Sequence, residues 1–172
     1  MSSMLGKSVL ITGGGSGIGR GVARHFAMQG ARVTISGRRE KKLAATSNEM
    51  NGKIAYVVGD VTREDDRKSM IQNSVKYGGR LDALISNAGN MYRSDVADLD
   101  EDELLSIFHS NVIAGMMLVK EAYDHLKRSQ GCIIFVGSVH TQRAFPNASP
   151  YAATKGALET LTGVLAAELG KD

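Results

Sequence analysis

A tyrosine and a lysine lie four residues apart near the end of the 172-residue chain, in the stretch Tyr151-Ala-Ala-Thr-Lys155. Residues at positions i and i+4 share one face of a helix, so the lysine ammonium can lie beside the tyrosine phenol. A nearby positive charge stabilises the deprotonated form of a phenol and brings it toward the range in which a general acid or base works. The pair therefore predicts proton transfer, although this spacing alone often arises by chance on helices.

A glycine-rich turn near the N-terminus predicts a second kind of chemistry, the binding of phosphate. Residues 9–11 form an apolar run typical of a strand buried on both faces of a parallel sheet, and apolar residues recur at helical spacing from Ile18 onward. A helix N-terminus presents unpaired N–H groups, and glycines let a pyrophosphate approach the backbone. The alternative is a glycine turn without a ligand, which its position between a strand and a helix disfavours. The turn residues expected to contact a dinucleotide are Gly13, Gly15, Ser16, Gly17, Ile18 and Gly19.

The residues after the second predicted strand indicate which dinucleotide binds. A strand is predicted at 32–36 and a helix at 39–50, and the sequence between them, Ser36-Gly-Arg38-Arg39, contains no acid. NAD sites place Asp or Glu at this point for the ribose 2′-hydroxyl, whereas NADP sites offer arginine to the 2′-phosphate. Cations at the start of a helix oppose its dipole, so an external anion explains Arg38 and Arg39 better than a solvated basic turn does. We therefore predict NADP(H).

Small or polar residues also follow the three later strands, which are predicted at 54–58, 81–85 and 131–136. Ligands of parallel α/β sheets bind at the carboxyl ends of the strands, so these residues are expected at the same edge as the glycine turn. The acids after the third strand also have a structural interpretation, because Thr62 and Asp65 fit a capping box for a helix predicted at 63–77. The residues concerned are Asp60, Val61, Asn87, Ala88, Gly89 and Ser138.

The chain resembles the short-chain dehydrogenase/reductase family from Lys7 to its last residue. Five features in family order carry the resemblance: Thr12-Gly-x-x-x-Gly17-x-Gly19, Asn87-Ala-Gly89, Asn111, Ser138 and Tyr151-x-x-x-Lys155. One mild departure is Ser86, at a position where the family usually has a second asparagine.

The resemblance implies a doubly wound parallel α/β sheet of the Rossmann type, with strand order 3-2-1-4-5, in one dinucleotide-binding domain over residues 1–172. Similar proteins continue past the helix predicted at 151–169 with further strands, so the resemblance implies that this chain is truncated at its C-terminus. The apolar strand at 131–136 is therefore expected to form an exposed sheet edge. The helices predicted at 100–128 and 151–169 resemble a pair that forms a dimer interface in related proteins, which implies a homodimer or homotetramer.

The resemblance also implies a catalytic role for four side chains. Tyr151 would donate a proton to the oxygen of a carbonyl substrate, and Ser138 would hydrogen-bond the same oxygen. Lys155 would assist Tyr151 and hold the ribose of the nicotinamide, and Asn111 would hold a water in a proton relay. An asparagine bonded within the core is the alternative for Asn111. The residues expected to line the rest of the cofactor are Asp60 and Val61 at the adenine, and Asn87, Ala88 and Gly89 at the inner ribose.

Composition excludes several other classes of function. The chain is 42% hydrophobic and 23% charged, with a net charge of +3. No apolar run approaches the ~20 residues that span a bilayer, so we expect no membrane segment and a cytoplasmic location. Nucleic-acid binding is disfavoured because basic residues cluster only at 38–42 and aromatic residues are few. The single Cys132 lies in an apolar run where a buried side chain is expected, and no spacing indicates a metal site.

Two classes of function remain. The first is an NADP(H)-dependent carbonyl reductase or alcohol dehydrogenase, similar to 3-oxoacyl reductases, acting on a small-molecule carbonyl substrate that the sequence does not identify. The second is a truncated, catalytically inactive module for nucleotide binding or association. A hydrolase built on Ser138 and His140 is disfavoured because no G-x-S-x-G turn is present, and we expect His140 to point away from Ser138.

Overall fold

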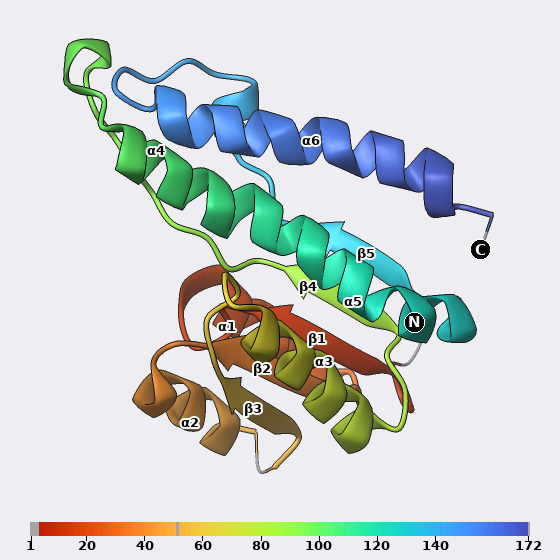
Figure 1. Cartoon of the computed structure of the whole chain (residues 1–172). Coiled ribbons are helices and arrows are strands. Elements are labelled where there is room, and N and C mark those ends of the chain that lie inside the picture. Colours follow the sequence, from red (N-terminus) through yellow and green to blue (C-terminus); the bar gives the residue numbers. More distant parts are fainter. Residues whose placement is uncertain (1–3, 51, 172) are drawn as a thin grey trace.

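Five parallel strands form a single sheet at the centre of the computed structural model, which describes residues 4–50 and 52–171 (Figure 1). The strand order β3-β2-β1-β4-β5 confirms the predicted order. Helices connect the strands and cover both faces, as parallel pairing requires. The elements are β1 (Ser8–Thr12), α1 (Gly17–Met28), β2 (Arg32–Gly37), α2 (Glu40–Asn48), β3 (Ile54–Val58), α3 (Glu64–Gly78), β4 (Ala83–Ser86), η1 (Val96–Asp98), α4 (Glu101–Phe108), η2 (His109–Ile113), α5 (Ala114–Ser129), β5 (Cys132–Phe135), η3 (Val139–Thr141) and α6 (Ser149–Leu169).

The central strand β1 forms the middle of the core. All five of its residues are buried, and Ile11 is in register with Ile35 of β2 on one side and Ile85 of β4 on the other. Each fully buried Val, Leu or Ile side chain contributes about 1.5–3 kcal/mol relative to an exposed one. This apolar centre fixes the carboxyl ends of β1, β2 and β4 beside one another, and those ends hold the candidate site.

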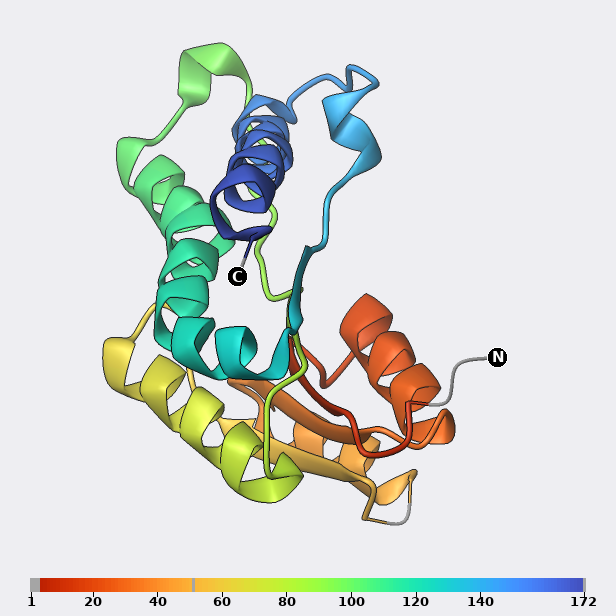
Figure 2. The ribbon, with the colours of Figure 1, turned by 90° about the vertical axis from the view of Figure 1, so that its right-hand side faces the viewer.

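Helices cover the two faces of the sheet unequally. Ala23 and Ala27 of α1 and Leu43 of α2 pack on one face. Helices α3 and α5 pack on the other, and Leu165 and Leu169 of α6 join that side (Figure 2).

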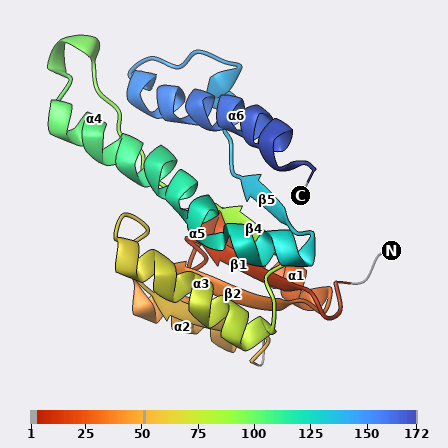
Figure 3. The same cartoon turned by 45° about the vertical axis from the view of Figure 1, so that its right-hand side comes forward.

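The helix predicted at 100–128 is one rod in Figure 3, but its backbone changes type in the middle. Asp100 caps its beginning, where Oδ1 accepts a hydrogen bond of 2.9 Å from the Glu103 N–H. The α-helix α4 passes into the π-helical segment η2 and then into α5. The predicted helix is therefore present along its length, but its five residues His109–Ile113, which include Asn111, are π-helical instead of α-helical. π-helical turns occur frequently at functional sites.

Two local predictions are wrong: the capping box at the start of α3 and the burial of Cys132 in β5. Helix α3 has Arg63 as its N-cap with no side-chain capping bond, so the capping box of Thr62 and Asp65 does not form. Instead the Thr62 hydroxyl donates to Asp60 Oδ1 at 2.8 Å. Cys132 is exposed rather than buried, because it begins β5, whose only neighbour among the described residues is β4.

Strand β5 forms an apolar sheet edge, as expected, with Ile134 among its exposed side chains. An apolar edge of this kind presents unpaired backbone groups to a further strand. None of the helices in the described part of the chain combines the length and the hydropathy that a bilayer crossing demands.

Candidate functional site

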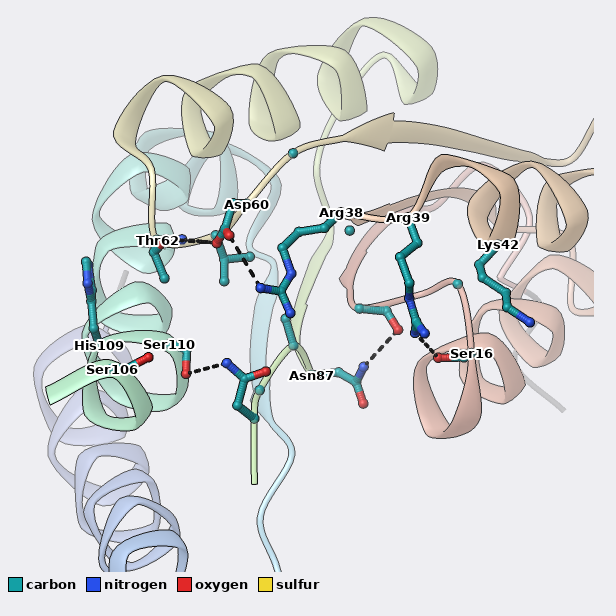
Figure 4. A pocket seen from close by; sticks show the side chains of 18 of the residues that line it. Ser16, Arg38, Arg39, Lys42, Asp60, Thr62, Asn87, Ser106, His109 and Ser110 are labelled. Carbon is teal, nitrogen blue, oxygen red and sulfur yellow. Dashed lines mark hydrogen bonds and ion pairs between the residues drawn. The ribbon is translucent and has the colours of Figure 1, made fainter. Parts of the chain in front are cut away.

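A cavity of about 910 Å³ lies at the carboxyl edge of β1, β2, β3 and β4 (Figure 4). The short connections after these strands supply most of its wall, because parallel strands all end at this edge. It brings together ten of the residues predicted to bind the cofactor: Gly13, Gly15, Ser16, Arg38, Arg39, Asp60, Val61, Asn87, Ala88 and Gly89. The predicted residues Gly17, Ile18 and Gly19 are not part of the wall, since they form the first turn of α1.

The glycine turn brings the backbone of α1 close to that of β1. A Cβ at Gly19 would lie 2.5 Å from the carbonyl oxygen of Gly13 and 2.5 Å from Asn87 Nδ2, so only glycine fits there. Helix α1 begins at Gly17 with no side-chain capping bond and no acid in its first turn. Its first N–H groups and partial positive charge therefore suit an external anion such as a pyrophosphate.

Thr12 and Asn87 join the ends of β1 and β4 beneath this turn. The Thr12 hydroxyl oxygen accepts hydrogen bonds from the N–H groups of Asn87 (3.1 Å) and Ala88 (3.0 Å). In return, Asn87 Nδ2 donates to the Thr12 carbonyl oxygen at 2.8 Å. Asn87 therefore fixes the floor of the cavity as well as lining it.

Three cations border the cavity on the side of β2 and α2 (Figure 4). Arg39 Nη2 donates to the Ser16 hydroxyl at 3.1 Å, which places the guanidinium beside the glycine turn. Arg38 lies 3.8 Å from Asp60 Oδ2 across the cavity, and its side chain is 66% exposed, so that ion pair is weak. Lys42 of α2 also lines the wall; the sequence places it in the basic cluster at 38–42 but did not single it out as a cofactor-binding residue.

Asp60 is held as a carboxylate on the opposite wall. Its Oδ1 accepts hydrogen bonds from the Thr62 N–H at 3.0 Å and from the Thr62 hydroxyl at 2.8 Å. Burial by itself raises the pKa of Asp60, but these two bonds and the charge of Arg38 outweigh it, so the pKa lies below the usual value. An ionised acceptor at this position suits an amine or hydroxyl donor on a ligand.

Helix α4 and segment η2 supply a wall that the sequence analysis did not anticipate. The signal was present, because residues three or four apart recur on one face of the predicted helix. Figure 4 shows His109 beside Thr62, with Ser106 and Ser110 further along the same wall. The lining residues on this side are Asp102, Leu105, Ser106, His109 and Ser110.

Asn111 uses both ends of its amide within the protein. Its Oδ1 accepts from the Asn90 N–H at 2.7 Å, and its Nδ2 donates to the Asn90 carbonyl at 3.0 Å and to the Thr154 hydroxyl at 3.1 Å. The side chain is buried, and a Cβ at Gly89 would lie 2.9 Å from its Oδ1. The π-helical backbone thus lets Asn111 tie the loop after β4 to helix α6.

Lys155 and Tyr151 share one face of α6, as their spacing predicts. Lys155 is only 6% exposed. Its Nζ donates to the Val136 carbonyl at 2.7 Å and lies 5.7 Å from the centre of the Tyr151 ring. Burial lowers the pKa of Lys155, and the carbonyl and the aromatic face partly offset the desolvation of its charge.

Ser138 follows β5 and lines a second cavity of about 300 Å³, together with Lys155. None of Ser138, Tyr151 and Lys155 lines the larger cavity, and Tyr151 does not line the smaller one. The acid/base candidates and the residues around the glycine turn therefore form two neighbouring parts of one sheet edge.

The orientation expected for His140 is wrong. Ser138 begins the short 3₁₀ helix η3, and this turn brings His140 Nδ1 to 3.0 Å from the Ser138 hydroxyl oxygen. The His140 ring also packs edge to face with the Tyr151 ring, with centres 5.1 Å apart. His140 therefore lies between the serine and the tyrosine instead of pointing away from them.

Comparisons with known proteins find chains that are similar over nearly the whole sequence. L-fucose dehydrogenase of Bos taurus is 34% identical over 165 residues, which cover 94% of this chain and 60% of that protein. Glucose 1-dehydrogenase of Gluconobacter oxydans (strain 621H) is 34% identical over 169 residues, covering 95% of this chain and 64% of that protein. The chain therefore spans roughly three fifths of the length of these curated relatives.

A solved structure and a family model extend the comparison. The crystal structure of 3-ketoacyl-(acyl-carrier-protein) reductase from Brucella melitensis, complexed with NADH, is 31% identical with a TM-score of 0.93. The match covers 98% of this chain and 72% of that one. The model of the short chain dehydrogenase family matches residues 7–172. With the strand order, the glycine turn and the Tyr151–Lys155 pair already in place, the chain belongs to the short-chain dehydrogenase family.

Proposed function

We propose that the protein is an NADP(H)-dependent oxidoreductase that interconverts a carbonyl compound and the corresponding alcohol. The observation that carries this proposal is the position of the buried Lys155 ammonium beside the Tyr151 ring, with Ser138 nearby across His140. A phenol, a cation and a hydroxyl donor at one site suit protonation of a developing alkoxide. The names of the similar proteins, two dehydrogenases and a reductase, support the same reaction class.

The larger cavity fits a dinucleotide phosphorylated on its ribose. The uncapped start of α1 suits the pyrophosphate, and Arg38, Arg39 and Lys42 suit a 2′-phosphate. Asp60 and Val61 are assigned to the adenine, and the inner ribose would lie along residues 87–89. NADP(H), when bound, supplies the hydride chemistry.

The chain's own residues supply the proton and hold the substrate oxygen. Tyr151 donates its phenolic proton to that oxygen, and Lys155 stabilises the phenolate that remains. Ser138 donates a hydrogen bond to the same oxygen, which offsets its developing negative charge. Asn111 holds the loop after β4 against α6, and we assign it the support of proton return to Tyr151 through water.

A second candidate is an inactive module that binds nucleotide or associates with another chain. It is favoured by the exposed apolar edge of β5, which can pair with a further strand. We further propose self-association through the rod α4–α5 and helix α6. Exposed apolar side chains at Ile113, Met116 and Val164 support this assignment.

The test is the oxidation of NADPH in the presence of a panel of ketones and 3-oxoacyl thioesters, followed at the absorbance of the reduced nicotinamide. We expect turnover with at least one carbonyl, and Tyr151→Phe should lower kcat by about 100-fold or more, the range of a lost general acid. Binding of NADPH by the variant, measured by fluorescence, should stay close to that of the wild type. Tight NADPH binding without turnover of any carbonyl would instead favour the inactive module.

A further inference from the structure

A histidine that the proposed chemistry leaves without a role lies between the two side chains assigned to the substrate oxygen. His140 Nδ1 is 3.0 Å from the Ser138 hydroxyl oxygen, and the backbone N–H of His140 donates to the same oxygen at 3.2 Å. The ring packs between two aromatic neighbours, with centres 4.4 Å from Phe145 and 5.1 Å from Tyr151. Its position is therefore fixed by contacts on several sides.

The other ring nitrogen of His140 indicates which nitrogen carries the hydrogen. Nε2 is buried and has no hydrogen-bond partner among the described residues. A neutral imidazole has one N–H donor and one acceptor nitrogen. A hydrogen on Nε2 would leave a buried donor unpaired, whereas a hydrogen on Nδ1 is paired with the Ser138 oxygen and leaves only a lone pair unused. Unpaired buried donors are the rarer defect in folded proteins, so the Nδ1–H form is favoured.

The Nδ1–H form determines what the Ser138 hydroxyl can do. The serine oxygen then accepts two hydrogen bonds, from His140 Nδ1 and from the His140 backbone N–H, and both of its lone pairs are used. Its own hydrogen is left to point elsewhere, and the cavity that Ser138 lines with Lys155 is open to it. Accepting hydrogen bonds also polarises an O–H group and makes it a stronger donor.

We propose that His140 is a positioning residue whose Nδ1–H group holds the Ser138 hydroxyl as a hydrogen-bond donor to the substrate oxygen. The kinetic part of this inference rests on the proposed reductase function. The geometric part concerns only His140 and Ser138, so it can be tested without turnover. Packing of the His140 ring against Tyr151 and Phe145 is the competing explanation of its position.

Two matched variants separate hydrogen bonding from packing. His140→Phe keeps a ring of similar shape against Tyr151 and Phe145 but has no donor. His140→Asn loses the ring but can place an amide N–H close to the position of Nδ1. We expect His140→Phe to lower kcat for ketone reduction about tenfold, with the KM for NADPH unchanged, as for the loss of one directed hydrogen bond. The kcat of His140→Asn should stay within about threefold of the wild type. If His140→Asn instead loses more activity than His140→Phe, the role of the ring is packing.

A double-mutant cycle then asks whether His140 acts through Ser138. If it does, His140→Phe should produce no further loss of kcat in a Ser138→Ala background. If the two substitutions instead lower kcat by independent factors that multiply in the double variant, the histidine acts through another group, Tyr151 being the nearest. That result would overturn the proposal.

Nitrogen NMR tests the geometric part directly, in protein labelled with ¹⁵N at its histidines. The signal of His140 is identified by its absence from the His140→Phe variant, which distinguishes it from His25, His109 and His125. At mildly alkaline pH, where the spectra show a neutral ring, we expect the hydrogen on Nδ1, and Ser138→Ala should move it toward Nε2. A wild-type ring with its hydrogen on Nε2 would overturn the inference. Absence of ketone turnover together with the Nδ1–H pattern would count against the proposed function alone.

Discussion

Arg38 and Arg39 are adjacent in the chain, yet each guanidinium meets a different wall of the larger cavity. Arg39 contacts Ser16 at the glycine turn, and Arg38 lies near the Asp60 carboxylate. Neither contact satisfies the five donors of a guanidinium, so both side chains retain donors for a ligand. A phosphate on the adenosine ribose could accept from both arginines, whereas an unphosphorylated ribose could not.

Arg39→Ala should therefore weaken NADPH binding selectively. We expect the Kd for NADPH to rise about tenfold or more and the Kd for NADH to change less than about threefold, because only the 2′-phosphate loses a charge-assisted hydrogen bond. Isothermal titration calorimetry with both cofactors measures the two constants. Lys53→Ala, which removes an exposed cation just before β3 at the opposite edge of the sheet, is the matched control. Equal weakening of both cofactors by Arg39→Ala would contradict this assignment.

At the scale of elements, Asp82 joins the beginnings of β1 and β4. Its carboxylate accepts hydrogen bonds from the Ser8 N–H at 2.9 Å, Lys7 Nζ at 3.0 Å and Arg80 Nη2, which lies 2.8 Å away. Burial by itself raises the pKa of Asp82, but these three donors outweigh it and lower the pKa from its ordinary value of 3.8. The ionised form is therefore favoured in the folded state.

The stability of the fold should depend on this carboxylate in acid. Because the folded pKa is the lower one, its stabilisation is complete above the ordinary pKa and is lost as the pH falls through the lowered value. Asp82→Asn should reduce the free energy of unfolding at neutral pH by about 1–3 kcal/mol and flatten its decline in acid. Urea denaturation across the acid range measures both effects. The exposed Asp124→Asn on α5 should leave the curve close to that of the wild type.

The elements that sequence reasoning located correctly depend on local patterns. The strand Ile54–Val58 has the predicted limits, because a short β-branched run ending in glycine is a local signal. The π-helical turn at Asn111 depends on Asn90 and Thr154, which are distant in the chain. The His140 contact likewise depends on a 3₁₀ turn that no spacing rule indicates. At the site, sequence reasoning identified the residues that directly follow the strands. It did not identify the lining residues of α4, because their place in the wall depends on how that helix lies over the sheet.

At the scale of the whole molecule, the outer surface of the rod α4–α5 and helix α6 is more apolar than a solvated helix surface requires. Met116 and Val164 are exposed by 47% and 48%. Exposed apolar patches on soluble proteins mark interaction sites when they are contiguous. Since α6 lies alongside the rod in Figures 1 and 3, both elements can contribute to one surface.

Met116→Glu should weaken self-association through this surface. We expect the wild type to sediment as a dimer or tetramer at micromolar concentration, and the variant to shift toward monomer because a buried unpaired charge is costly. Sedimentation velocity over a range of concentrations reports the shift. Val96→Glu, at an exposed apolar position in η1 before the first residue of α4, is the control. A wild-type protein that is monomeric at every concentration would show that this surface is not a self-association interface.

The π-helical segment η2 determines which side of the rod each residue of α5 faces. Each residue of an α-helix advances the chain by about 100° around the axis, and a π turn accommodates one residue more than an α turn. Segment η2 therefore changes the direction in which the side chains of α5 point around the helix axis. As a result, Leu118, Ala122 and Leu126 face the sheet while Asn111 faces Thr154. An unbroken α-helix over the same residues would turn that apolar stripe about 100° away from the core, whereas deleting one residue between 109 and 113 would restore the α-helix and leave the stripe facing the sheet. A single buried amide is thus accommodated by a change of helical pitch.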